Sequence, residues 1–142
     1  MKFTPTALAG VYVIELEPIS DHRGWFARAW CSQEFSNHGL ETHWVQANQA
    51  STDKAGTLRG MHYQVPPFAE IKLIRCIRGS IYDQIIDLRD GSETYGQSFG
   101  LELSQDNAKM LYVPAGFAHG YLTLEDDSQA FYQVSEFYTP GA

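Results

Sequence analysis

Cysteine is scarce in this chain of 142 residues: only Cys31 and Cys76 occur, far apart in the sequence. This separation excludes the closely spaced cysteine pairs of zinc-binding and dithiol redox motifs. We therefore expect two ordinary buried thiols in a protein of a reducing compartment.

Long hydrophobic runs are absent as well. Residues 1–10 lack the apolar core of a secretory signal peptide, and no segment is long and apolar enough to span a membrane. Positive charge is in deficit, with 10 Lys and Arg against 17 Asp and Glu and a net charge of −7. This balance disfavours nucleic acid and anionic membranes as partners. We expect a cytoplasmic protein with neither partner.

The remaining composition is that of a globular protein, with 44% hydrophobic and 19% charged residues. The length fits one domain over residues 1–142, and the aromatic share of 13% suits β structure or an aromatic-lined cleft. The arginines of this acidic chain predict a local basic pocket for a small anionic ligand. They are Arg23, Arg28, Arg59, Arg75, Arg78 and Arg89.

Short strand-like runs separated by turn signals recur along the whole chain, which predicts an all-β sandwich or barrel. One short helix is expected at 32–39, with Ser32 as N-cap, Glu34 in the first turn and Gly39 at the end. The predicted strands are 11–16, 43–48, 57–64, 72–78, 81–88, 99–103, 109–114, 120–125 and 129–137.

Two segments set a histidine among strand-forming residues and glycines, namely LRGMHYQ with His62 and LYVPAGFAHGY with His119. Pro114, Gly116 and His119 match the end of the second signature motif of metal-binding cupin barrels. Gln64 stands where the first motif would place a second histidine. Two histidines fall short of the three or four ligands that a catalytic metal requires. The motifs therefore favour a barrel and disfavour a metal site.

Proton transfer is the better interpretation of His62, because a neutral imidazole is the usual general base near pH 7. Asp83 and Asp87 alternate with isoleucines on one predicted strand, and an inward carboxylate must have a partner. Asp83 beside His62 would fix the imidazole tautomer. The alternative is a salt bridge from the carboxylate to Arg75 or Arg78 at the barrel rim.

Lys72 begins a strand of apolar residues, where an inward ammonium group calls for an anion such as a developing enolate or a phosphate. A lysine whose charged end reaches solvent from the strand end is the alternative. Tyr132 could be a core residue or a phenol acid facing a cleft, and Tyr138 a stacking platform for a ring.

Taken together, the motifs resemble those of the dTDP-4-dehydrorhamnose 3,5-epimerase family, in family order through the whole chain. The matching stretches are DHRGWF (21–26), VQAN (45–48), LRGMHYQVPP (58–67), KLIR (72–75), GSIYD (79–83), DLRDGS (87–92), VPAGFAHG (113–120) and EFY (136–138).

The resemblance implies a cupin-type jelly-roll barrel, usually a homodimer, that needs no metal or other cofactor. Its substrate is a nucleotide-diphosphate 4-keto-6-deoxy sugar. By position, His62 would remove a proton next to the ketone, Lys72 would stabilise the enolate oxygen, and Tyr132 would return a proton to the opposite face. The expected substrate contacts are Arg59 and the dimer partner's Arg23 at the diphosphate, His119, Gln46 and Asn48 along the sugar and nucleotide, and Phe26 and Tyr138 at the base.

The reaction agrees with these residue types. Hydrogens at C3 and C5 are both α to the C4 ketone, so one enolate-stabilising cation can serve both centres. Inversion of a centre needs an acid and a base on opposite faces. Each positioned acid or base typically raises the reaction rate about 10²–10⁴-fold. Apolar barrel walls would also strengthen the attraction between Lys72 and the enolate by excluding water.

Three departures from the family pattern are visible. Arg28 stands where an acidic residue usually helps to recognise thymine, and an arginine cannot accept a hydrogen bond. Glu70 replaces a customary glutamine. Family members also continue past Tyr138 into a segment that pairs an aspartate with the catalytic histidine, which leaves Asp83 as the candidate partner of His62.

Three alternatives to epimerisation remain open at this stage. A ketoisomerase would move the carbonyl from C4 to C3 through the same enediol. A catalytically silent sugar-nucleotide-binding barrel would bind without proton exchange, and a metal-dependent cupin oxygenase is the least favoured.

Overall fold

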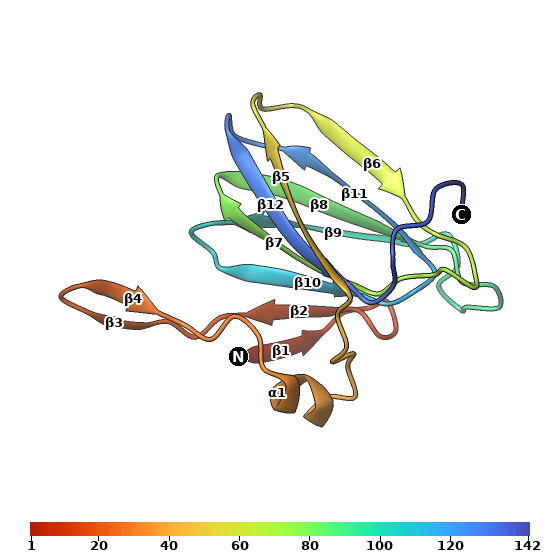
Figure 1. Cartoon of the computed structure of the whole chain (residues 1–142), viewed down its shortest axis with the longest axis horizontal. Helices are drawn as coiled ribbons and strands as arrows, with labels where there is room; N and C mark the ends of the chain where they lie inside the picture. Colours follow the sequence, from red (N-terminus) through yellow and green to blue (C-terminus); the bar gives the residue numbers. More distant parts are fainter.

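The computed structural model describes all residues from 1 to 142 and consists mainly of antiparallel strands in two facing sheets (Figure 1). One sheet has the order β1-β2-β10-β7-β12-β5 and the other β6-β11-β8-β9, while β3 and β4 form a separate hairpin. The expected all-β cupin-type barrel with one short helix is confirmed. The elements are β1 (Lys2–Pro5), β2 (Tyr12–Glu15), β3 (Ile19–Asp21), β4 (Gly24–Phe26), α1 (Ser32–Asn37), β5 (Gln46–Thr52), β6 (Leu58–His62), β7 (Lys72–Arg78), β8 (Ser80–Asp87), β9 (Ser98–Ser104), β10 (Lys109–Val113), β11 (Phe117–Thr123) and β12 (Ser128–Val134).

The space between the sheets holds a core of 12 buried residues drawn from both of them. Ile74 of β7 and Leu111 of β10 face Ile81 and Ile85 of β8, and all four side chains are fully buried. Alternation along each strand turns every second residue to this core, and removal of such apolar area from water is the main stabilising term.

A second cluster lies on the outer face of the six-stranded sheet, where α1 covers it through the fully buried Phe35. The expected N-cap is wrong by one residue, because Cys31 occupies that position and makes no side-chain capping bond. Gly39 follows the helix with φ of 69°, as its predicted role requires.

Cys31 is half-buried and Cys76 buried, so only the second thiol fits the expectation of burial. The single helix, α1, is too short to span a lipid bilayer.

Several strand boundaries differ from the predicted ones. β11 begins at Phe117 instead of the predicted residue 120, so His119 lies within the strand. Pairing with β6 on one side and β8 on the other imposes the extended conformation there. β12 ends at Val134, so Tyr138 lies beyond the strand.

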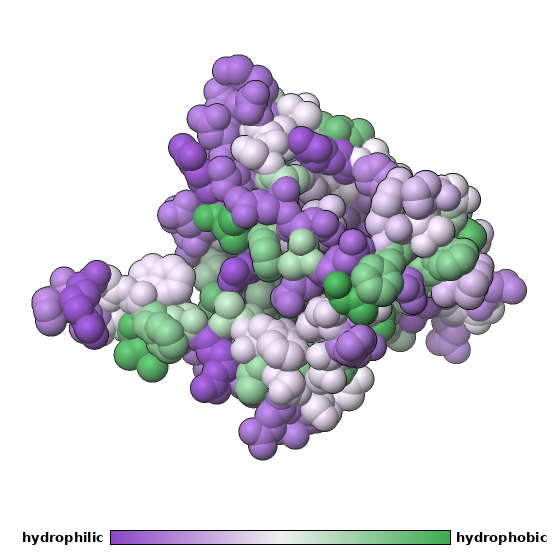
Figure 2. Space-filling view, viewed as in Figure 1, coloured by the Kyte–Doolittle hydropathy of each residue, from purple (hydrophilic) through white to green (hydrophobic).

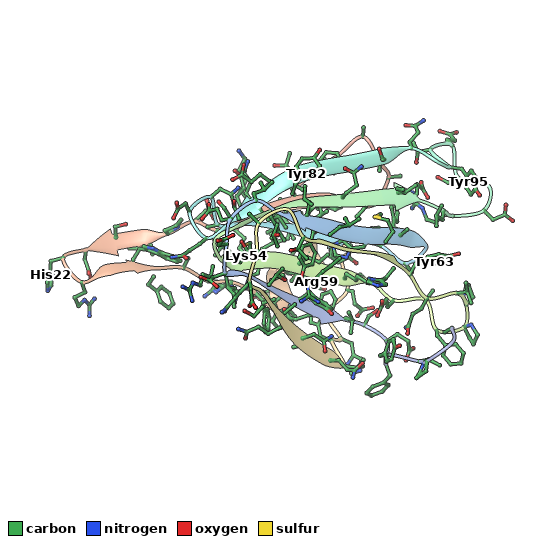
Figure 3. All side chains as sticks on the ribbon, turned by 90° about the horizontal axis from the view of Figure 1, so that it is seen from above. His22, Lys54, Arg59, Tyr63, Tyr82 and Tyr95 are labelled. Carbon is green, nitrogen blue, oxygen red and sulfur yellow. The ribbon has the colours of Figure 1, made fainter.

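The β3–β4 hairpin, which the sequence did not predict, projects away from the barrel (Figures 1 and 3), with His22 at its tip. Its apolar side chains are exposed: Ile19 by 74%, Trp25 by 59% and Phe26 by 73%. Figure 2 shows hydrophobic atoms at the stem of this projection, beside a hydrophilic tip. An isolated two-stranded hairpin is marginally stable in water, so these side chains lack a covering surface within the chain.

Two glycines bring β6 and β11 unusually close together. A Cβ atom on Gly60 would lie 2.7 Å from Gly120 Cα and 2.8 Å from the His119 carbonyl oxygen, and Gly60 has φ of 105°. The pairing shifts its register between His119 and Tyr121, which places His119 directly opposite His62. This contact sets the position of both histidines.

Substitution of Gly60 by alanine tests this constraint. We expect a loss of about 3 kcal/mol or more in the free energy of unfolding, since overpacking costs about 1–3 kcal/mol and left-handed backbone about 1–2 kcal/mol. Urea unfolding measures it. Gly91→Ala is the matched control, because Gly91 has φ of 73° but no atom near the added Cβ. Equal losses in the two variants would show that the close approach is unimportant.

Candidate active site

A cavity of about 920 Å³ opens between the sheets and is lined by 20 residues. We call it the barrel cavity. Eight of the eleven predicted site residues line it: Gln46, Asn48, Arg59, His62, Lys72, His119, Tyr132 and Tyr138. Asp83, Arg23 and Phe26 do not.

The pairing of β5 with β12 explains one wall of the barrel cavity. Tyr132 lies opposite Asn48, and Val134 lies opposite Gln46. Because alternate residues share a face and directly paired residues share it too, all four side chains turn inward. Gln46 also accepts a hydrogen bond of 2.8 Å from the Tyr138 backbone, which anchors that residue at the edge of the cavity.

The opposite wall carries the two histidines. His62 of β6 and His119 of β11 are paired across the antiparallel ladder, so both rings lie on the cavity face. His119 is buried with 7% exposed, whereas His62 is open to solvent. Water is therefore excluded from His119, as expected for the whole site, but not from His62.

Asp83 is fully buried and pairs with His119, with 2.7 Å between its Oδ1 atom and Nε2 of the ring. The predicted pairing of Asp83 with His62 is wrong, because β11 lies between β8 and β6 in the sheet. The alternative salt bridge to Arg75 or Arg78 is also wrong, since His119 is the only ion-pair partner of Asp83.

The Asp83–His119 contact fixes the orientation of the imidazole. The carboxylate accepts this hydrogen bond, so Nε2 carries the hydrogen and Nδ1 is left for a ligand. The second carboxylate oxygen, Oδ2, is buried without a hydrogen-bond partner.

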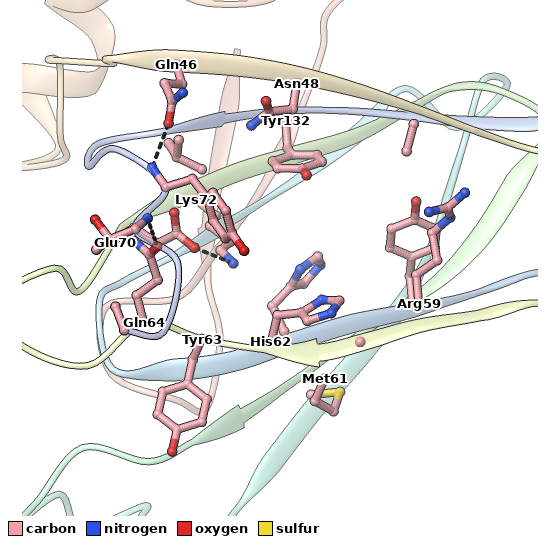
Figure 4. A pocket seen from close by; sticks show the side chains of 18 of the residues that line it. Gln46, Asn48, Arg59, Met61, His62, Tyr63, Gln64, Glu70, Lys72 and Tyr132 are labelled. Atoms are coloured by element: carbon pink, nitrogen blue, oxygen red, sulfur yellow. Dashed lines mark hydrogen bonds and ion pairs between the residues drawn. The ribbon is translucent and has the colours of Figure 1, made fainter.

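Lys72 is buried at the start of β7, in contrast to a strand-end lysine whose charge reaches solvent. Its Nζ atom lies 2.7 Å from Oε1 of Glu70. Figure 4 shows this ion pair inside the cavity, on the side that Gln46 and Gln64 also approach. An ammonium group at this depth requires such a partner.

Burial raises the pKa of the Tyr132 phenol, and the nearby Glu70 carboxylate raises it further, while Arg59 lowers it. Burial also raises the pKa of Tyr121, which lies on β11 two residues after His119 and lines the same cavity. Both phenols therefore hold their protons at neutral pH and can donate hydrogen bonds.

The expected basic pocket of six arginines is wrong for a single chain, because only Arg59 lines the barrel cavity. Arg59 donates to Thr52 Oγ1 at 2.8 Å and to the Ser51 carbonyl at 3.1 Å, both uncharged acceptors. The remaining arginines act elsewhere: Arg23 pairs with Asp21, Arg28 with Glu34 and Arg89 with Asp87, Arg75 lies over the Phe131 ring, and Arg78 ends β7.

Gln64 holds the chain end against the cavity, a role the sequence reasoning missed. Its amide donates to the carbonyls of Phe68 (2.8 Å) and Phe137 (3.2 Å) and accepts from the Thr139 backbone (2.8 Å). Tyr121 was missed as well: it falls in the predicted strand 120–125, but the matching stretch VPAGFAHG ends at residue 120. No three His, Cys, Asp or Glu side chains are grouped as metal ligands.

Comparison with known proteins gives one consistent family. The family model described as dTDP-4-dehydrorhamnose 3,5-epimerase matches residues 5–142. The enzyme of that name from Sinorhizobium fredii is 40% identical over 139 residues, which are 98% of this chain and 71% of the relative.

Solved structures agree. The dTDP-4-dehydrorhamnose 3,5-epimerase of Bacillus anthracis with TDP and PPi bound superposes with a TM-score of 0.95 and 38% identity, over 98% of this chain and 79% of the other. The dTDP-6-deoxy-D-glucose-3,5-epimerase of Legionella pneumophila in complex with dTDP-4-keto-L-rhamnose gives 0.93 and 30%, over 99% and 74%.

Alkaline titration tests the environment of Tyr132. Its raised pKa means that the phenol contributes stability below the ordinary tyrosine pKa of about 10, and that this contribution is lost as pH rises through the folded value. We expect Tyr132→Phe to remove one late-titrating phenol in an ultraviolet difference titration and to reduce the alkaline loss of stability. Tyr95→Phe, at an exposed position, is the control. An unchanged late phase in Tyr132→Phe would contradict the assignment.

Proposed function

Because this chain belongs to the dTDP-4-dehydrorhamnose 3,5-epimerase family, it is an isomerase of nucleotide-linked 4-keto-6-deoxy sugars, and we propose that His62, Lys72 and Tyr132 carry its proton transfers. The observation that supports this assignment is their convergence on the barrel cavity from three strands, β6, β7 and β12. The reaction belongs to deoxysugar and polysaccharide biosynthesis.

The two facing sheets supply the geometry that inversion needs. His62 comes from the four-stranded sheet and Tyr132 from the six-stranded sheet, so a sugar ring between them would meet a base on one side and a phenol on the other. The raised pKa of Tyr132 keeps its proton available for donation.

In the proposed mechanism the His62 imidazole takes a proton from the carbon next to the C4 ketone. The electrons of the broken C–H bond form a carbon–carbon double bond, and the carbonyl electrons move to the C4 oxygen. The Lys72 ammonium stabilises this enolate. The Tyr132 phenol then protonates the same carbon from the opposite face, and solvent restores both groups. No change in oxidation state occurs, so the mechanism calls for no cofactor.

His119 and Asp83 take a supporting role in this proposal. The carboxylate fixes the imidazole, and His119 presents Nδ1 to the sugar. Gln46 and Asn48 line the adjacent wall.

Arg59 is proposed to bind the diphosphate, because it lines the cavity without a carboxylate partner. A homodimer is part of the proposal, since the exposed β3–β4 hairpin would carry Arg23 and Phe26 to the cavity of a second copy. Phe26 and Tyr138 would then enclose the nucleotide base. The pairing of Arg28 with Glu34 leaves thymine recognition to other groups.

Two unpaired cysteines support a cytoplasmic location.

Solvent exchange tests the base. Incubated with a dTDP-4-keto-6-deoxy sugar in D₂O, the protein should introduce deuterium at C3 or C5, as followed by NMR. We expect His62→Ala to lower the exchange rate about 10²–10⁴-fold, whereas the exposed His43→Ala should not change it. Binding without exchange in the unmodified protein would favour a silent binding barrel, and a ketone moved to C3 would identify a ketoisomerase.

Tyr132→Phe separates proton removal from inversion. His62 still exchanges the proton on its own face, so deuterium incorporation should continue with retained configuration. Formation of the inverted product should fall about 10²–10⁴-fold. NMR analysis of the product configuration measures both. Full inversion in Tyr132→Phe would exclude this phenol as the acid.

A further inference from the structure

Glu70 introduces a carboxylate into the part of the barrel cavity where the proposed enolate forms. Its Oε1 atom lies 2.7 Å from Lys72 Nζ, and the two side chains are 13% and 9% exposed. Opposite charges at this distance and depth interact strongly and compensate each other's lost hydration. The Lys72 end of the cavity is therefore close to electroneutral.

The backbone keeps this carboxylate on the cavity side. Ile71 lies between the two charged residues and makes two hydrogen bonds with Ser135: its N–H donates to Ser135 Oγ (2.9 Å), and its carbonyl accepts from the Ser135 N–H (3.1 Å). In an extended segment the residues on either side of Ile71 face the same way. Ile71 packs on the second core cluster, so Glu70 and Lys72 both face the cavity.

Arg59 is the other strongly basic side chain of the cavity, since it and Lys72 are the only Lys or Arg among the lining residues. Figure 4 shows Arg59 at the far end from the Glu70–Lys72 pair, with His62 and Tyr132 between them. Arg59 is exposed and bonded only to uncharged oxygen atoms, whereas Lys72 is buried and paired. Arg59 thus has no acidic partner in the cavity, whereas Lys72 is already paired with a carboxylate.

We propose that Glu70 is a specificity-determining residue that excludes phosphate groups from the Lys72 end of the cavity and so sets the direction in which the substrate binds. The inference rests on the proposed function, in which the ligand carries a diphosphate. A cavity with two unpaired cations would offer that group two positions, one of which places the nucleotide where the sugar should react. Glu70 neutralises the inner cation and repels the anion.

The pair does not prevent the proposed chemistry at Lys72. An ammonium group has three N–H donors, and Glu70 takes one of them. A ketone oxygen is uncharged when it binds, so the carboxylate does not repel it as it repels a diphosphate. Lys72 therefore accepts a neutral carbonyl and rejects a preformed anion, and the diphosphate is directed to Arg59.

Calorimetric titration with inorganic diphosphate tests this proposal without turnover. We expect Arg59→Gln to weaken binding at least about tenfold, and Arg59→Gln/Glu70→Gln to regain about tenfold of affinity at the released lysine. Adding Lys72→Met to that pair should abolish the regained binding. Arg59→Gln/Glu102→Gln is the control, because Glu102 is exposed on β9 outside the cavity.

Two results would overturn the proposal: no gain of affinity from Glu70→Gln, or a gain that survives Lys72→Met. Circular dichroism checks that each variant is folded. If Glu70→Gln does not fold, Glu70→Ala replaces it as the variant that removes the carboxylate charge. Failure of the proposed function has a different signature, which is a protein that shows the expected diphosphate pattern but exchanges no deuterium. Exchange together with an unresponsive Glu70 would reject this inference alone.

Discussion

The contact between the backbones of Gly60 and Gly120 is the constraint on which the rest of the site depends. It draws β6 against β11 closely enough to shift the register, and it puts His62 and His119 opposite each other on one wall. Any side chain at either glycine would meet backbone atoms, so the position of the imidazoles is determined by the absence of two Cβ atoms. The second wall, from β5 and β12, then needs only regular pairing to present its polar residues at the same depth.

Two acidic side chains of the site, Asp83 and Glu70, each contact a basic partner. The partner of Asp83 is distant in the sequence, whereas that of Glu70 is only two residues away. Asp83 reaches His119 across one ladder, while Glu70 and Lys72 meet because they flank a single residue of an extended segment. Both pairs lie largely out of solvent, and each leaves part of its hydrogen-bonding capacity unused. Arg59 has no acidic partner at all. The cavity therefore combines one neutralised ion pair in its interior, Glu70–Lys72, with one unpaired cation, Arg59, near solvent.

Sequence reasoning recovered the β class and one helix, because alternation and turn residues are local signals, whereas Gln46 and Asn48 were placed at the site only by the family resemblance. It failed where the answer depended on which strands become neighbours. The assignment of Asp83 to His62 needed the order β6-β11-β8, which a strand pattern does not contain. Tyr121 was overlooked although it lies in the predicted strand 120–125, because a strand pattern does not show which of its side chains turn toward a cavity. The β3–β4 hairpin has no periodic signal because its strands are three residues long.

Gln64 shows how a position can become committed to a single task. It occupies the place where metal-binding cupins have their second histidine, yet both ends of its amide serve three backbone groups that hold residues 137–139 beside the cavity. A ligating imidazole would have one remaining ring nitrogen and could replace at most one of those bonds. Conversion of this barrel into a metalloenzyme would thus require other groups to hold residues 137–139 beside the cavity.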